Sequence, residues 1–113
     1  MHEAHLAQDL VEVAVAEAEK QGAKRIRRVR FRVGRKYQVV PEALEIGFRM
    51  AAEGTIAAGA TLDVEQVPLA GKCRRCGARA ESDEPILVCE ACGGTDVAVL
   101  QGNEMVLASL DVE

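Results

Sequence analysis

The sequence has few aromatic residues, with no tryptophan, one tyrosine and two phenylalanines in 113 residues. Proteins that bind single-stranded nucleic acids usually stack bases on aromatic side chains, so this scarcity disfavours that class. The net charge of −4 also disfavours a polyanionic partner. A core built from this composition must be aliphatic.

Common catalytic and targeting signals are missing as well. There is no glycine-rich phosphate loop, and no histidine follows His5, so no Ser/His/Asp set can be assembled. No long apolar run indicates a secretory signal or a membrane span. The sequence therefore predicts a cytoplasmic protein that is not an enzyme and has no membrane partner.

The chain does contain four cysteines in two Cys-x-x-Cys pairs, separated by twelve residues. They are Cys73, Cys76, Cys89 and Cys92. Two such pairs can supply the four corners of a tetrahedral zinc site, and Gly77 and Gly93 follow where the backbone must turn with positive φ. Disulfides are the alternative, but they need an oxidising compartment. Four sulfurs leave no open coordination position, so we predict a structural Zn²⁺.

The segment around these cysteines, residues 70–100, is too short to bury a core of its own and should depend on the metal for its fold. Two short strand-like runs, 86–88 and 97–100, are available to cover the zinc loops. We expect this zinc domain to be an insertion, with linkers near 68–72 and 101–103.

Hydrophobic periodicity predicts two helices. Residues 4–20 place an apolar arc on one side at 100° per residue, and Gly22 ends the helix. The arc consists of Leu6, Ala7, Leu10, Val11, Ala14 and Ala18. Pro41 suits the first turn of a second helix, which Gly54 should end.

Alternation of apolar and polar residues predicts three strands, near 28–33, 61–67 and 105–110. The second should run parallel to the first, because a helix connects them, and the third antiparallel to the second. The predicted fold class is α+β, with two helices packed on a three-stranded mixed sheet and an inserted small zinc-ribbon-like domain. The α/β domain would comprise residues 1–69 plus 101–113.

Positive charge is concentrated in residues 24–36, which contain eight Lys/Arg and no acid. The remainder holds six Lys/Arg against 18 Asp/Glu, a net charge of −12. A strand with one solvated face explains this run. The alternative is a zinc-ribbon module that binds nucleic acid, as in transcription-type proteins, through phosphate contacts. Its candidate residues are Arg25, Arg27, Arg28, Arg30 and Arg32.

The amino terminus offers a second set of metal donors. The Met1 amine, the His2 amide nitrogen and the His2 imidazole can close adjacent chelate rings on one ion, with the Glu3 backbone nitrogen or carboxylate as fourth donor. Square-planar nitrogen donors suit Ni²⁺ or Cu²⁺, whereas zinc prefers a tetrahedron. An ordinary disordered chain end is the alternative. His5, with Asp9 one helical turn later, is either an accessory ligand of this site or an exposed helix histidine.

Taken together, these features resemble the HypA family of nickel-insertion accessory proteins. They are the Met-His-Glu start that leads into a helix, the basic strand, the Val-Pro-Glu-Ala-Leu stretch at residues 40–44 and the late pair of Cys-x-x-Cys motifs. The similarity spans essentially the whole chain. Ala4-His5 departs from the larger apolar residue followed by serine that is more usual in the family.

The resemblance implies a nickel metallochaperone for maturation of [NiFe] hydrogenase, with urease as a further recipient for some members. The expected partners are the GTPase HypB and the hydrogenase large-subunit precursor, with no nucleic acid, and the chain would be a monomer or weak homodimer. Met1, His2 and Glu3 match the family's nickel-binding start, and the four cysteines match its structural zinc ligands. The family fold agrees with the elements predicted above.

Overall fold

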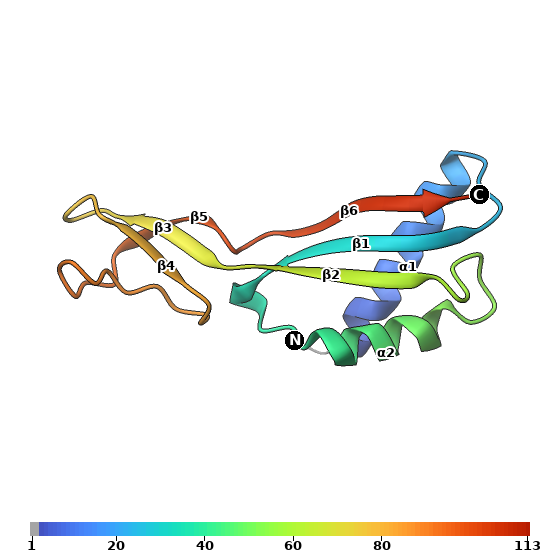
Figure 1. Ribbon diagram of the computed structural model, residues 1–113, viewed down its shortest axis with the longest axis horizontal. Helices are drawn as coiled ribbons and strands as arrows, with labels where there is room; N and C mark the ends of the chain where they lie inside the picture. The colour runs from blue at the N-terminus through green and yellow to red at the C-terminus, as the bar shows by residue number, and fades with distance from the viewer. Residues whose placement is uncertain (1–2) are drawn as a thin grey trace. The chain divides into compact units, whose positions relative to one another are not determined.

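The computed structural model describes residues 3–113, which form two compact units (Figure 1). Unit 1 contains the chain up to Phe31, together with Val39–Glu65 and Val106–Glu113. Unit 2 contains Arg32–Gln38 and Gln66–Met105. Among residues 3–113, no helix has the length and apolar character needed to cross a membrane.

Two helices belong to unit 1. Helix α1, Glu3–Lys20, buries the predicted arc except for Leu6, which is half-buried. Helix α2, Pro41–Ala52, begins with proline in its first turn and buries Leu44, Phe48 and Ala52, which are spaced by one turn each. The positive φ of Gly54 follows the end of α2.

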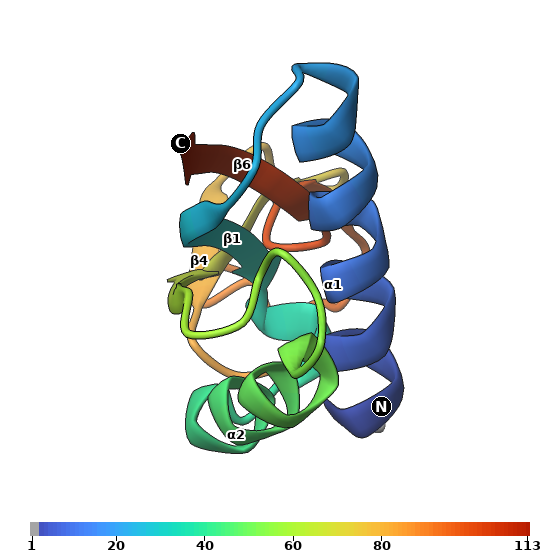
Figure 2. The same cartoon turned by 90° about the vertical axis from the view of Figure 1, so that its right-hand side faces the viewer.

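The helices lie side by side because small residues meet between them. A Cβ added at Gly47 would lie 3.1 Å from the Ala7 Cβ and 3.7 Å from the Glu3 carbonyl oxygen. The helices also lie on the same side of a sheet (Figure 2).

The sheet has the strand order β2-β1-β6. Its strands are β1 at Ile26–Gly34, β2 at Thr61–Val67 and β6 at Met105–Val112. Strand β1 buries Val29, Phe31 and Val33 and exposes arginines between them, as the alternation predicts.

Strands β1 and β2 run in the same direction, and β6 runs in the opposite one (Figure 1). Backbone hydrogen bonds agree with this direction for β6: the Lys24 amide donates to the Glu113 carbonyl, and the Gly34 amide donates to the Glu104 carbonyl. The three-stranded mixed sheet with two helices confirms the predicted fold class.

Unit 2 contains a second sheet, with the order β4-β3-β5. The central strand β3, Leu69–Cys73, pairs antiparallel with both β4, Arg79–Ser82, and β5, Val97–Gln101. A short 3-10 helix, Arg35–Tyr37, also belongs to this unit, where the Tyr37 hydroxyl donates to the Asn103 carbonyl at 2.8 Å.

Two local predictions for this region are wrong. Residues 68–72 are largely strand β3 rather than a linker, and 86–88 form no strand. Residues 83–86 are bends and the run lies outside the sheet, although Leu87 is buried. The predicted run near 97–100 does form a strand, β5.

Candidate metal centre

The two Cys-x-x-Cys motifs meet in unit 2. Cys73 is the last residue of β3, and the second pair lies in the loop before β5. All four Sγ atoms lie within 4.8 Å of one another, so the structure brings the four candidate ligands together. Cys73 and Cys89 are buried, whereas Cys76 and Cys92 are exposed.

The distances between sulfurs fit one tetrahedral ion. The Sγ atoms of Cys73 and Cys92 are 3.7 Å apart, and those of Cys76 and Cys89 are 3.4 Å apart. Zinc–sulfur bonds of about 2.3 Å in a regular tetrahedron place neighbouring sulfurs about 3.8 Å apart. A disulfide needs about 2.05 Å, so neither measured pair is bonded. The donor set and its spacing therefore fit Zn²⁺ closely.

Both loops use the same backbone turn. In the first, the Gly77 amide donates to the Cys73 carbonyl at 2.9 Å; in the second, the Gly93 amide donates to the Cys89 carbonyl at 2.6 Å. The φ angles of these glycines are +77° and +75°, in the left-handed region that residues with a side chain rarely adopt. The glycines after each motif are thus required by the turn that aims the sulfurs.

Hydrogen bonds in the cluster give the thiols of Cys73 and Cys76 different pKa values. The backbone amides of Cys76 and then Arg75 donate to the Cys73 sulfur and lower the pKa of Cys73 from 9.0 to about 6. A hydrogen bond from Ala78 lowers the pKa of Cys76, but hydrogen bonding with Cys89 and burial outweigh it and raise that pKa to about 11. The hydrogen bonds thus favour a thiolate at Cys73 and a protonated thiol at Cys76.

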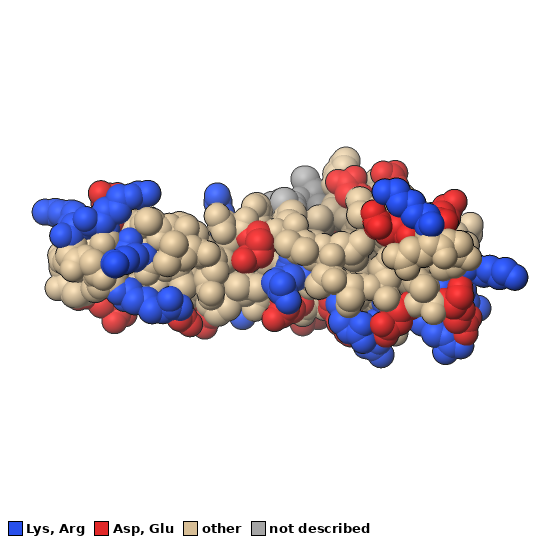
Figure 3. Space-filling view, turned by 90° about the horizontal axis from the view of Figure 1, so that it is seen from above, with Lys and Arg blue, Asp and Glu red and all other residues tan. Residues whose placement is uncertain are grey.

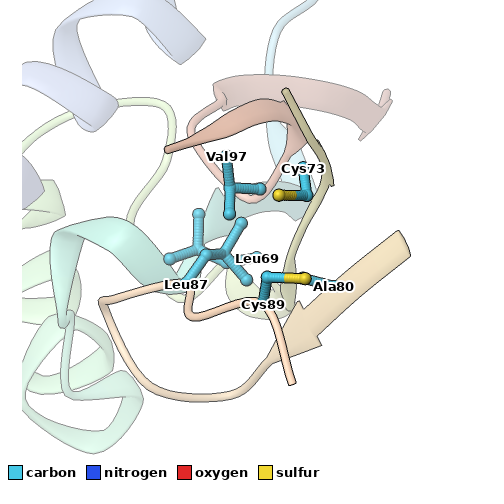
Figure 4. Close-up of a cluster of buried hydrophobic side chains, with 6 residues drawn as sticks. All are labelled: Leu69, Cys73, Ala80, Leu87, Cys89 and Val97. Carbon is cyan, nitrogen blue, oxygen red and sulfur yellow. The ribbon is translucent and has the colours of Figure 1, made fainter. Parts of the chain in front are cut away.

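A small apolar core supports the cysteines. Leu69, Leu87 and Val97 gather beside the buried Cys73 and Cys89 (Figure 4). Cys73 and Cys89 are themselves two of the six residues that form this core, the sixth being Ala80. Because a third of the core consists of candidate ligands, folding of this segment is coupled to the metal site.

A family description fits this arrangement across the whole chain. The pattern for "Hydrogenase/urease nickel incorporation, metallochaperone, hypA" matches residues 1–112. The chain belongs to the HypA family. This confirms the resemblance drawn from the sequence motifs.

Curated relatives and solved structures agree with this membership. The chain is 37% identical over all 113 residues to the hydrogenase maturation factor HypA of Chlorobium limicola, covering 97% of that protein. It is 35% identical to the factor of the same name from Methylocella silvestris, covering 100% of both chains. The solution structure of the Ni metallochaperone HypA from Helicobacter pylori superposes with a TM-score of 0.68 at 28% identity, over 99% of this chain and 97% of that one.

The candidate nickel ligands of this HypA-family chain are described only in part. Met1 and His2 lie outside the described residues. Glu3 is the first residue of α1, and its carboxylate accepts a hydrogen bond from the Val40 amide at 3.1 Å. His5 and Asp9 are exposed on α1 and are not part of the cysteine cluster.

The arginines of β1 form ion pairs with neighbouring strands. Arg30 donates to both carboxylate oxygens of Asp111 in β6, at 2.9 and 3.1 Å. Arg28 contacts Asp63 in β2 at 2.5 Å, and Arg27 contacts Glu113. In the right-hand half of Figure 3, acidic side chains lie beside most of the basic ones.

These carboxylates were missed by the sequence interpretation. Asp63, Asp111 and Glu113 occupy alternate, polar positions of the outer strands or their ends, which was the signal available. Because they neutralise three of the five arginines that the nucleic-acid hypothesis uses, the structure disfavours that hypothesis.

Proposed function

We propose that this protein is a nickel metallochaperone that delivers Ni²⁺ for maturation of [NiFe] hydrogenase, with urease as a second recipient, and holds a structural Zn²⁺. The zinc ligands would be Cys73, Cys76, Cys89 and Cys92. The nickel donors would be the Met1 amine, the His2 amide and imidazole, and Glu3. The observation that supports this proposal best is the match to the HypA family over residues 1–112, together with a sulfur cluster of tetrahedral dimensions.

The geometry of Glu3 supports its backbone nitrogen, rather than its carboxylate, as the fourth nickel donor. The carboxylate is already engaged by the Val40 amide. A site made largely of chain-end nitrogens can release its ion to a recipient, as delivery requires.

The remaining parts of the proposal concern the setting. The protein would act in the cytoplasm, without catalytic turnover of its own, as a monomer or weak homodimer. Its partners would be the GTPase HypB and the hydrogenase large-subunit precursor. We also propose the domain assignment made from the sequence. A zinc domain at residues 70–100 would be inserted into a nickel-binding domain at 1–69 plus 101–113.

Metal analysis of the untagged protein tests the proposal. We expect one equivalent each of nickel and zinc in the wild type, and loss of nickel alone in His2→Ala or after addition of one residue before Met1. His5→Ala is the matched control; nickel retained there excludes His5 as a required ligand. Nickel binding should weaken as the pH falls, because protons compete for the amine, amide and imidazole nitrogens. Stoichiometric nickel in both altered amino termini would refute the site.

A further inference from the structure

Helix α2 is apolar on two opposite sides. Its inward side consists of Leu44, Phe48 and Ala52, all at most 1% exposed. At about 100° per residue, the side chains of Ala43, Ile46 and Met50 point roughly 180° away from that side. Ile46 is 58% exposed and Met50 is 68% exposed. We call these three residues the outer stripe of α2.

An outer stripe of this kind is unusual for a helix that covers a sheet, because the solvent side is normally polar. The core does not need Ile46 or Met50, since α2 already packs through Leu44, Phe48 and Ala52. Isoleucine and methionine that remain mostly exposed one turn apart provide adjacent apolar side chains that a partner can bury.

The charges on the two helices define the chemistry of that partner. Helices α1 and α2 contain seven acidic residues and two basic ones. The acids are Glu3, Asp9, Glu12, Glu17, Glu19, Glu42 and Glu45. Lys20, one of the two bases, is already paired with Glu17. With two bases against seven acids, the two helices carry a net charge of −5, which repels an anionic membrane surface and attracts a surface rich in Lys/Arg.

The outer stripe is also near the beginning of α1. Gly47, within α2, faces the first turns of α1: a Cβ placed on it would lie 3.1 to 3.8 Å from the Ala7 side chain, the Glu3 carbonyl and the Ala4 backbone. Ile46 is the residue next to Gly47. A protein bound along the stripe would therefore border the start of α1, where the proposed nickel ligands precede the helix.

We infer that the outer stripe of α2 is a docking surface for a protein partner in nickel transfer, one that presents apolar side chains surrounded by Lys/Arg. This inference rests on the proposed function for the identity of the pathway, and on the exposure and charge of the helices for the surface itself. Ile46 and Met50 are buried on binding, and the acids of both helices orient the approach.

Calorimetric titration with the purified GTPase HypB, and separately with the purified hydrogenase large-subunit precursor, tests the inference. Glutamine is helix-compatible, so the double variant Ile46→Gln/Met50→Gln keeps α2 while removing the apolar contact. We expect its affinity for at least one of the two proteins to fall about tenfold or more. Val13→Gln is the matched control, because Val13 is a 50% exposed apolar residue of α1; its affinities should stay unchanged.

A second variant tests the charge requirement. Glu42→Lys/Glu45→Lys should weaken the same complex, and the wild-type affinity should decrease as salt is added. Unchanged affinity of the double glutamine variant for both proteins, or the absence of binding to either by the wild type, would overturn the inference. So would a loss of self-association alone, since it would identify a second copy as the occupant.

Nickel stoichiometry separates this inference from the proposed function. The double glutamine variant should keep its nickel and zinc, whereas His2→Ala should lose nickel and still bind the partner. Loss of docking with intact nickel binding thus supports the surface, and absence of nickel in the wild type refutes the carrier function without affecting the docking result.

Discussion

Gly71 in β3 provides a steric test of how the second sheet supports the cysteine cluster. A Cβ added at this position would lie 2.2 Å from the Ala98 carbonyl oxygen and 2.8 Å from a Val97 methyl group. Ordinary carbon–oxygen contacts are about 3.3 Å or longer. Gly71→Ala must therefore push β5 away from β3 by about 1 Å, which lengthens their backbone hydrogen bonds beyond useful range.

The expected cost is about 1–3 kcal/mol, the usual range for an overpacked site. Strand β3 ends at Cys73 and β5 begins shortly after Cys92, so separating the strands also separates the two cysteine pairs. Because folding of such a unit and metal binding are coupled, the same free energy should appear as about 5- to 150-fold weaker zinc binding. Competition with a coloured zinc chelator measures this affinity.

Gly54→Ala is the control, because Gly54 has φ +79° and nothing within 4 Å of an added Cβ. It should cost about 1–2 kcal/mol of unit 1 stability through the left-handed backbone, with unchanged zinc affinity. Gly71 does not have a positive φ, so only the contact with β5 penalises a methyl group there. Wild-type zinc affinity and thermal stability in Gly71→Ala would refute the proposed coupling between β5 and the cluster.

Two further predictions concern an ion pair and the core of unit 1. The hydrogen bond and charge of Arg30 lower the pKa of Asp111, so the favourable pairing is lost as pH falls through that lowered pKa. Arg30→Gln should therefore raise the pKa of Asp111, which an NMR titration of the carboxyl group measures. An unshifted titration would contradict the pairing. Phe48→Ala should destabilise unit 1 by about 3–5 kcal/mol, because Phe48 is 1% exposed and its removal leaves a cavity. Urea unfolding measures this loss, and zinc should be retained. A loss under about 1 kcal/mol would show that the surrounding side chains close the cavity.

The sequence predicts the elements of unit 1 closely because burial there follows simple periods. The apolar arc of α1 and the alternation of Val29, Phe31 and Val33 each leave one arrangement in which the large side chains are buried. The sequence does not predict that β1 lies in the centre of its sheet. This position depends on strand pairing over long sequence separations, and no single segment encodes it.

Unit 2 was less predictable, for physical reasons that particular residues illustrate. Strand β3 reads Leu-Ala-Gly-Lys-Cys, which lacks β-branched residues, and it is a strand because β4 and β5 both pair with it. Ile86 and Val88 have strong strand propensity, yet both are exposed outside the sheet. The cysteine spacing, in contrast, predicted the cluster directly, because two residues between thiols suit one ion whatever the surrounding strands.

The unequal exposure of the four sulfurs has a consequence for exchange of a bound ion. Cys76 and Cys92 face solvent, one from each loop, while Cys73 and Cys89 are enclosed by the small core. A competing ligand would therefore reach a bound ion more readily from the side of Cys76 and Cys92. Cys73 and Cys89, one from each loop, would hold the ion from the enclosed side and so join the two loops.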